Sequence, residues 1–94
     1  MTFYRAKYES ASKVYVKGAR VRAITFSLRT QTKQNAQGDA VEFSGKFTTT
    51  EAIKKGALVI GEMGGRMTVY RVASVSIGMA GIYNYYISTE AGQI

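Results

Sequence analysis

The stretch "ALVIGEMGGRMTVYRVASVSIGMAGIYNYYIS", residues 57–88, decides the fold of this chain. It contains three apolar runs separated by two glycine-rich segments, in the order 57–62, 63–65, 66–77, 78–81 and 82–88. β-Branched and aromatic residues favour strands, and glycine supplies the backbone conformations that tight turns require. The pattern predicts three consecutive antiparallel strands joined by turns, which is a β-meander.

Further strands are expected upstream of the meander. Residues 12–18 alternate between valines and charged or aromatic side chains, which predicts a half-buried strand ending at the glycine. Residues 19–28 are rich in β-branched and aromatic residues and indicate a second strand. Residues 40–48 predict a hairpin with a two-residue turn at 44–45.

A long loop and a short helix are expected between these strands and the meander. Residues 29–39 are polar throughout, which predicts a long polar loop. Thr48 and Glu51 have the spacing of a capping box, and Gly56 can end a helix in the left-handed conformation. The sequence therefore predicts one short helix here, with Ile53 as its apolar anchor.

These elements predict the fold class of the whole chain. Its 94 residues, of which 46% are hydrophobic, are enough for one small core, so we expect a single domain over residues 1–94. The last residues, 89–94, are expected to fray. Five to seven antiparallel strands and one short helix predict a mostly β fold, a small partly open β-barrel or sandwich.

The residue types that carry most enzyme chemistry are missing from the sequence. It has no cysteine, which excludes disulfides and thiolate metal sites, and no histidine, the commonest general base and metal ligand. Glu42 and Glu62 are the only candidates for the paired carboxylates of a small hydrolase, and no local motif joins them. We therefore expect no enzyme, no cofactor and no metal site.

The sequence shows neither a targeting segment nor a membrane span. The first residues lack the apolar run of a secretory signal peptide. The longest uncharged run, residues 72–89, spans 18 residues, but it contains serines, an asparagine and glycines that suit two strands around a turn. We expect a protein made in the cytoplasm that does not enter a membrane.

Basic residues are concentrated in the first half of the chain. Residues 1–47 hold nine Lys or Arg and three acids, whereas residues 48–94 hold four and three, for a net charge of +7. This asymmetry favours a polyanion or an acidic protein as partner, although ordinary solvated faces would give the same composition. The candidate binding residues are Lys13, Lys17, Arg20, Arg22, Arg29 and Lys33.

Aromatic residues offer two further interpretations. In the first half of the chain they alternate with cations, as in proteins that stack single-stranded bases and neutralise phosphates. Tyrosine is also enriched at protein interfaces, while cross-strand pairing in the core would explain the same residues. The candidate interface aromatics are Tyr15, Tyr83, Tyr85 and Tyr86.

Two parts of the sequence resemble small structural proteins of tailed bacteriophages. The first has an apolar strand, a hairpin and a short helix that starts with an acid, as in small virion proteins, with matches at Phe43, Gly45, Phe47, Thr49, Glu51 and Leu58. The second resembles the C-terminal meander of phage head-closure proteins, with matches at Gly56, Val59, Tyr70, Val72 and Val75. Together they cover about residues 19–88.

The resemblance implies a ring- or trimer-forming β-domain without catalysis, held by edge-strand and loop contacts. It places the protein in the virion, either as a capsid decoration or at the head–tail neck, with copies of itself and with capsid or portal and neck proteins. The basic face would then meet DNA or an acidic protein surface. The alternative that the residues leave open is a small basic β-barrel that binds single-stranded nucleic acid.

Overall fold

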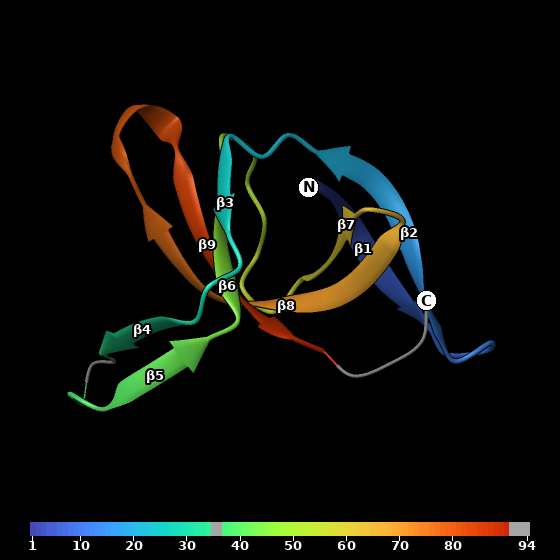
Figure 1. Ribbon diagram of the computed structural model, residues 1–94, viewed down its shortest axis with the longest axis horizontal. Coiled ribbons are helices and arrows are strands. Elements are labelled where there is room, and N and C mark those ends of the chain that lie inside the picture. The colour runs from blue at the N-terminus through green and yellow to red at the C-terminus, as the bar shows by residue number, and fades with distance from the viewer. Residues whose placement is uncertain (35–36, 91–94) are drawn as a thin grey trace.

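A computed structural model describes residues 1–34 and 37–90, most of which lie in β-strands (Figure 1). The described strands, in chain order, are β1 (Thr2–Glu9), β2 (Val14–Val21), β3 (Thr25–Ser27), β4 (Gln31–Gln34), β5 (Ala40–Phe43), β6 (Gly45–Thr49), β7 (Leu58–Met63), β8 (Arg66–Ile77) and β9 (Tyr83–Thr89). One turn of 3₁₀ helix, Met79–Gly81, lies between β8 and β9.

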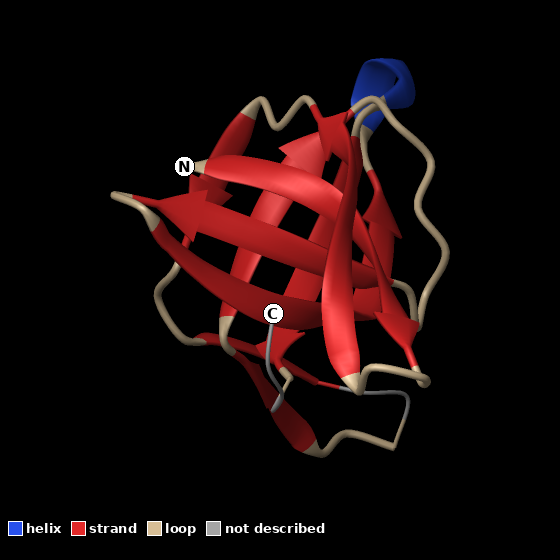
Figure 2. Ribbon diagram, turned by 90° about the vertical axis from the view of Figure 1, so that its right-hand side faces the viewer, coloured by secondary structure: helices blue, strands red, loops and turns tan. Residues whose placement is uncertain are grey.

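Seven strands form one antiparallel sheet in the order β2-β1-β7-β8-β9-β6-β3, and β4 pairs with β5 in a separate two-stranded sheet. The large sheet curls around itself (Figure 2). Within the described residues no ladder joins the edge strands β2 and β3, so the curled sheet is not a closed barrel. The prediction of a mostly β, partly open fold is confirmed.

Strand β8 connects the two halves of the curled sheet. Its first half pairs with β7, from Arg66 opposite Met63 to Arg71 opposite Leu58, and its second half pairs with β9. The β9 ladder shifts register at Ala73, and such a bulge bends the strand and increases its twist. The predicted meander is thus confirmed, with β8 as the strand that turns the sheet.

The main core fills the interior of the curled sheet. The ring of Phe3 on β1 stacks on the ring of Phe47 on β6, with centroids 4.4 Å apart, and contacts the edge of Phe26 on β3 at 6.2 Å. These contacts join β1, the second strand in the sheet order, to β6 and β3, the last two. Burying such rings is the main favourable term that holds the sheet in its curled shape.

A second, smaller cluster lies on the opposite face of β1, β2, β7 and β8. Neighbouring residues on a strand point to opposite faces, so Val59 faces the main core and Ile60 faces away from it. Ile60 is nevertheless fully buried, because it packs with Tyr15 and Val69. The apolar run of β7 is therefore buried on both of its faces.

The N-terminal strands differ from the prediction. The sequence interpretation left residues 2–9 unassigned, whereas they form β1 in the middle of one half of the sheet. The predicted end of a strand at Gly18 is also wrong, because β2 continues to Val21. Gly18 sits where a side chain would bring Cβ to 3.0 Å from the carbonyl oxygen of Arg5, which explains a glycine in mid-strand.

The predicted loop and hairpin between residues 29 and 48 are replaced by a different pairing. Strand β4 lies inside the predicted loop and pairs with β5, while residues 35–36 of that loop lie outside the described residues. Strands β5 and β6 do not pair with each other. Instead, the backbone N–H of Ser44 donates to the Ile87 carbonyl, and the Ser44 hydroxyl accepts from the Thr89 N–H. Ser44 is therefore bound to β9 at the point where the chain passes from the small sheet to the large one.

The predicted helix over residues 48–56 is absent. Thr48 belongs to β6, where it pairs with Asn84, and the chain that follows is an irregular segment ending in a turn at Gly56, which has a φ of +90°. Ile53 is buried, as its predicted role of apolar anchor requires. At the C-terminal end, residue 89 closes β9 rather than fraying, and residues 91–94 of the predicted tail lie outside the described residues.

Candidate functional site

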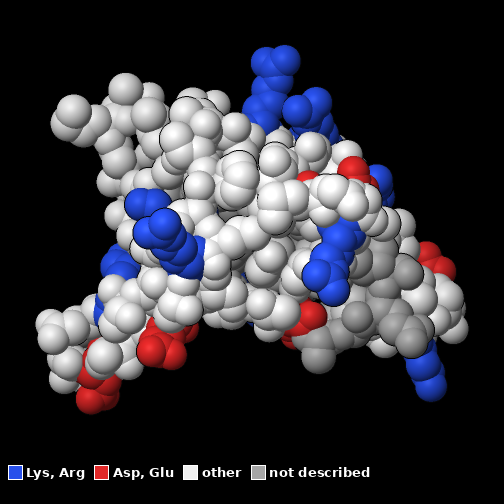
Figure 3. All heavy atoms as spheres, viewed as in Figure 1, with Lys and Arg blue, Asp and Glu red and all other residues white. Residues whose placement is uncertain are grey.

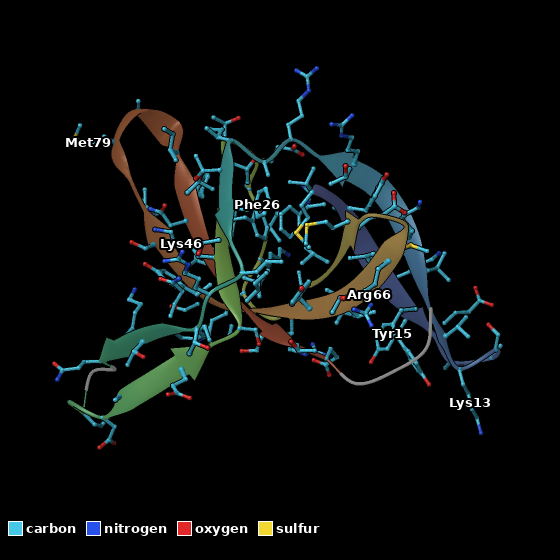
Figure 4. All side chains as sticks on the ribbon, viewed as in Figure 1. Lys13, Tyr15, Phe26, Lys46, Arg66 and Met79 are labelled. Atoms are coloured by element: carbon cyan, nitrogen blue, oxygen red, sulfur yellow. The ribbon has the colours of Figure 1, made fainter. Side chains whose placement is uncertain are left out.

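The six predicted cationic residues do not form one surface. Lys13, Lys17, Arg20 and Arg22 lie on or beside the edge strand β2, with Lys13 at the tip of the β1–β2 hairpin (Figure 4). Arg29 follows β3, the strand at the other end of the large sheet, and Lys33 lies in β4 of the small sheet. The structure therefore separates the predicted set into two groups, and Figure 3 shows Lys and Arg side chains in several separate places on one face.

Part of the β2 group already has partners within the chain. The Nζ atom of Lys17 lies 3.7 Å from Oε2 of Glu62 and 4.4 Å from the centroid of the Tyr4 ring. An exposed ion pair of this kind adds at most about 1 kcal/mol of stability, but it reduces the charge available to a partner. The free cations of this group are Lys13, Arg20 and Arg22, which are exposed and in no ion pair with a described residue.

The predicted interface tyrosines have different environments. Tyr85 is fully buried and Tyr15 nearly so, which makes Tyr85 a core residue rather than an interface residue in this fold. Tyr83 is half-buried and stacks on Tyr85, with ring centroids 5.9 Å apart. Tyr86 points to the other face of β9, where it is half-buried beneath the β4–β5 hairpin.

A pocket of about 320 Å³ lies between the β4–β5 hairpin, the turn before β7 and the bulge of β8. Its lining combines apolar side chains, two ammonium groups and a hydroxyl, from Lys33, Gln34, Val41, Phe43, Lys55, Ala73 and Ser74. The volume lies at the lower end of the range for ligand sites. No carboxylate lines it.

Two lysine ammonium groups lie close to the ring of Tyr86, beside this pocket. The Nζ atoms of Lys33 and Lys46 lie 4.5 Å and 5.8 Å from the centroid of its ring, and the ring of Phe43 lies 5.4 Å from it. The face of an aromatic ring attracts a nearby cation. The sequence interpretation singled out Lys33 but missed Lys46, because only the pairing of β6 with β9 brings it near Tyr86. It also missed Lys55, which lines the pocket from the turn before β7.

A strong ion pair fixes the backbone next to the pocket. The guanidinium of Arg71 binds both carboxylate oxygens of Glu90, at 2.9 Å and 3.3 Å, and also donates to the carbonyl of Gly56 at 2.8 Å. The hydrogen bond with Glu90 raises the pKa of Arg71, and the hydrogen bond from Arg71 holds the pKa of Glu90 below its usual range. The turn that carries Lys55 is thereby tied to β8.

The β8–β9 hairpin projects beyond the large sheet and ends in apolar side chains (Figure 1, Figure 4). At this tip Ile77 is 77% exposed and Met79 is 87% exposed. No charged residue occurs between Val72 and Thr89. We call the residues 77–82 the apolar tip.

The two carboxylates singled out in the sequence, Glu42 and Glu62, lie in different sheets. Glu42 lies in the small sheet, and Glu62 lies in the large sheet next to Lys17, so they do not form an acid–base pair. Residues 1–34 and 37–90 contain no group of three potential ligands that could hold a metal ion. They also contain no helix with the length and apolar character needed to cross a membrane.

Comparison with known proteins returned no match to a family model, to a curated protein or to a solved structure.

Proposed function

We propose that this protein is a non-enzymatic structural component of a tailed-bacteriophage particle. It assembles with copies of itself and with other virion proteins at the head or at the head–tail neck. The observation that carries the proposal is the apolar tip, an exposed and uncharged end of a projecting hairpin on a chain with a net charge of +7.

The apolar tip suits a contact between proteins. Two large apolar side chains, Ile77 and Met79, are exposed together at one end of the molecule. Exposed apolar side chains that gather in one place mark interaction sites on soluble proteins. Because copies of a strongly basic chain repel each other, an uncharged projection is the part of the surface that approaches a neighbour at the least electrostatic cost.

The edges of the sheet are weaker candidates for contact. β2 carries Lys17 and Arg20, and charged side chains on an edge strand discourage pairing with another chain. β3 has only three residues, which leaves little backbone for a new ladder. The hairpin tip is therefore favoured over edge-strand addition as the main contact.

The neck is the better supported position within the particle. The residues that resemble a head-closure meander, Gly56, Val59, Tyr70, Val72 and Val75, all lie in or beside the observed meander of β7, β8 and β9. The hairpin and the short helix of the other resemblance do not form, since β5 and β6 do not pair and residues 50–56 contain no helix.

Removing the apolar character of the tip tests the proposal. We expect the double variant Ile77→Ser/Met79→Ser to lose self-association, measured as mass by light scattering. The matched control is Met63→Ser, because Met63 is also exposed, at 52%, but lies at the β7–β8 turn. An unchanged oligomer in the tip variant would refute the proposal, as would equal losses in the tip and control variants.

A second candidate function is binding of single-stranded nucleic acid, favoured by the two cations, Lys33 and Lys46, near the Tyr86 ring. Such binding would weaken with salt, with a slope that reports the number of phosphates neutralised. Titration of the protein with an oligonucleotide at two salt concentrations distinguishes it from assembly driven by the apolar tip.

A further inference from the structure

We infer that the pocket beneath the β4–β5 hairpin binds a short acidic segment of a partner protein, in which carboxylates flank an apolar side chain. Lys33 and Lys55, which line the pocket, bind the carboxylates, while Lys46 adds positive charge beside Tyr86. Val41, Phe43 and Ala73 receive the apolar side chain. The inference rests on the proposed function, because it names the chemistry of a partner in the assembly. The pocket and the apolar tip share no residue.

No carboxylate of the described chain balances the positive charge of the lysines in and beside the pocket, which favours an anionic ligand. The three lysines come from β4, from β6 and from the turn before β7, and the ion pairs of the described chain involve none of them. Two of them share the ring of Tyr86, at 4.5 Å and 5.8 Å from its centroid. Like charges held near one another raise the energy of the free protein, and a bound carboxylate lowers it.

Hydrogen-bond donors are available beside these charges. Ser74 lines the pocket directly after the bulge at Ala73, and its hydroxyl makes no hydrogen bond to a described residue. The backbone next to Lys55 is held in place, because both backbone groups of Gly56 are bound to β8: its N–H donates to the Val72 carbonyl, and its carbonyl accepts from Arg71. A carboxylate at this place therefore meets a hydroxyl and an ammonium group carried on backbone that is already fixed.

The apolar part of the lining defines the rest of the ligand. Phe43 is only 7% exposed and forms the inner wall, while Val41 lies two residues earlier on the same face of β5. About 320 Å³ is room for a few side chains and not for a folded element. A short extended segment with an apolar residue between two acids matches both the charge and the shape.

A nucleic-acid chain fits the same surface less well. The Tyr86 ring lies against Lys33 and Phe43, so a base has no free aromatic face on which to stack. Asp39 and Glu42 are exposed on the same hairpin, and acidic side chains are visible over β4 and β5 in Figure 3. A phosphodiester chain extending from the pocket along the hairpin would meet this negative charge, whereas a short acidic segment ends before it.

Titration of the ¹⁵N-labelled full chain with a blocked peptide, Gly-Glu-Leu-Glu-Gly, tests the inference by NMR. We expect saturable shifts at the amides of Val41, Ala73 and Ser74, with a Kd below about 1 mM. Lys55→Gln should weaken this binding about fivefold, the value of one exposed ion pair. Lys54→Gln is the matched control, since Lys54 is exposed next in the chain but does not line the pocket, and it should leave the Kd unchanged.

Four results would each overturn the inference. They are no saturable shift with the acidic peptide, equal binding of the Gly-Gln-Leu-Gln-Gly peptide, equal effects of the two lysine variants, and tighter binding of oligothymidylate at the same amides. Light scattering on Lys55→Gln separates this outcome from the proposed function. We expect the variant to keep the wild-type mass, and a monomeric wild type would refute self-assembly while leaving the peptide titration decisive for the pocket.

Discussion

The backbone N–H of Ile53 donates to the hydroxyl of Tyr85 at 2.7 Å, across 32 residues of sequence. The same hydroxyl donates to the carbonyl of Glu51 at 2.7 Å. Tyr85 thus satisfies two backbone groups of the segment that follows β6, which a helix would otherwise have satisfied internally. Ile53 of this segment packs in the main core, and the segment ends at the turn that carries Lys55. The Tyr85 hydroxyl therefore holds in place the backbone that leads from the core to the pocket.

Replacing Tyr85 by phenylalanine should destabilise the protein by about 1–3 kcal/mol, because one buried and one partly buried backbone group lose their partner while the ring remains. Urea unfolding followed by circular dichroism measures the change. Tyr83→Phe is the matched control, since the Tyr83 hydroxyl makes no hydrogen bond to a described residue, and it should cost less than about 0.5 kcal/mol. Equal costs in the two variants would contradict the role assigned to the Tyr85 hydroxyl.

The stability of the protein should fall at alkaline pH through Tyr85. Burial raises the pKa of its phenol above the ordinary value, and the hydrogen bond from the Ile53 N–H only partly offsets this. A group whose pKa is raised by folding contributes stability that is complete below the unfolded pKa and is lost as the pH rises through the folded pKa. We expect unfolding free energies to decline above about pH 10. The decline should be smaller in Tyr85→Phe, and an identical decline in both proteins would contradict the assignment.

The pair of Arg71 and Glu90 should respond to acid. The hydrogen bond from Arg71 lowers the pKa of Glu90, so the pair contributes stability above the unfolded pKa of the carboxyl and loses it as the pH falls through the lower, folded pKa. Carboxyl ¹³C NMR of Glu90 during an acid titration measures this pKa directly. Arg71→Gln should move it up toward the usual glutamate value. A Glu90 pKa that is the same in both proteins would show that the pair does not form in solution.

Gly45 should not tolerate a side chain. A Cβ at this position would lie 2.6 Å from the carbonyl oxygen of Ser27 and 3.2 Å from the Cα of Leu28, both of which are backbone atoms. Gly45→Ala must therefore separate β3 from β6, and we expect a loss of about 1–3 kcal/mol in urea unfolding. Gly38→Ala serves as the comparison, since its φ of +85° strains a side chain but nothing lies within 4 Å. A smaller loss for Gly45→Ala than for Gly38→Ala would contradict this packing.

The part of the fold that was predicted from the sequence is the part in which neighbouring strands follow each other along the chain. Apolar runs with glycine-rich turns at 63–65 and 78–81 leave one simple pairing, and β7, β8 and β9 adopt it. Contacts between distant segments were not predictable in this way. Strand β1 pairs with β7, more than 50 residues later. The residues that share the parity of Phe3 along β1 include Arg5 and Lys7, which weakens the alternation that would have revealed the strand.

The predicted helix failed because tertiary contacts outweigh a weak local preference. A helix of two turns is not stable by itself in water, so the capping-box spacing of Thr48 and Glu51 is not enough to make this segment helical. In the structure Thr48 continues β6 and bonds to Thr25, with their hydroxyl oxygens 2.7 Å apart. The Glu51 side chain instead accepts from the backbone N–H of Arg22 at 2.7 Å.

The pocket was beyond sequence reasoning for a related reason. The lysines in and beside it lie at positions 33, 46 and 55, and no local pattern connects them. They meet only because β4 folds back on β5, β6 pairs with β9, and Arg71 ties the turn at Gly56 to β8. The net charge and its concentration in the first half of the chain were visible from the sequence, but the place where unpaired charge gathers was not.

The mass of the purified wild-type protein, measured by light scattering at low and high salt with and without an oligonucleotide, tests the central claim most directly. A structural module that assembles through its apolar tip should form a defined multiple of 10.3 kDa that the oligonucleotide does not change and that salt does not dissociate. A 10.3 kDa monomer that gains mass only with the oligonucleotide, and loses it again at high salt, would contradict the claim and establish the nucleic-acid alternative.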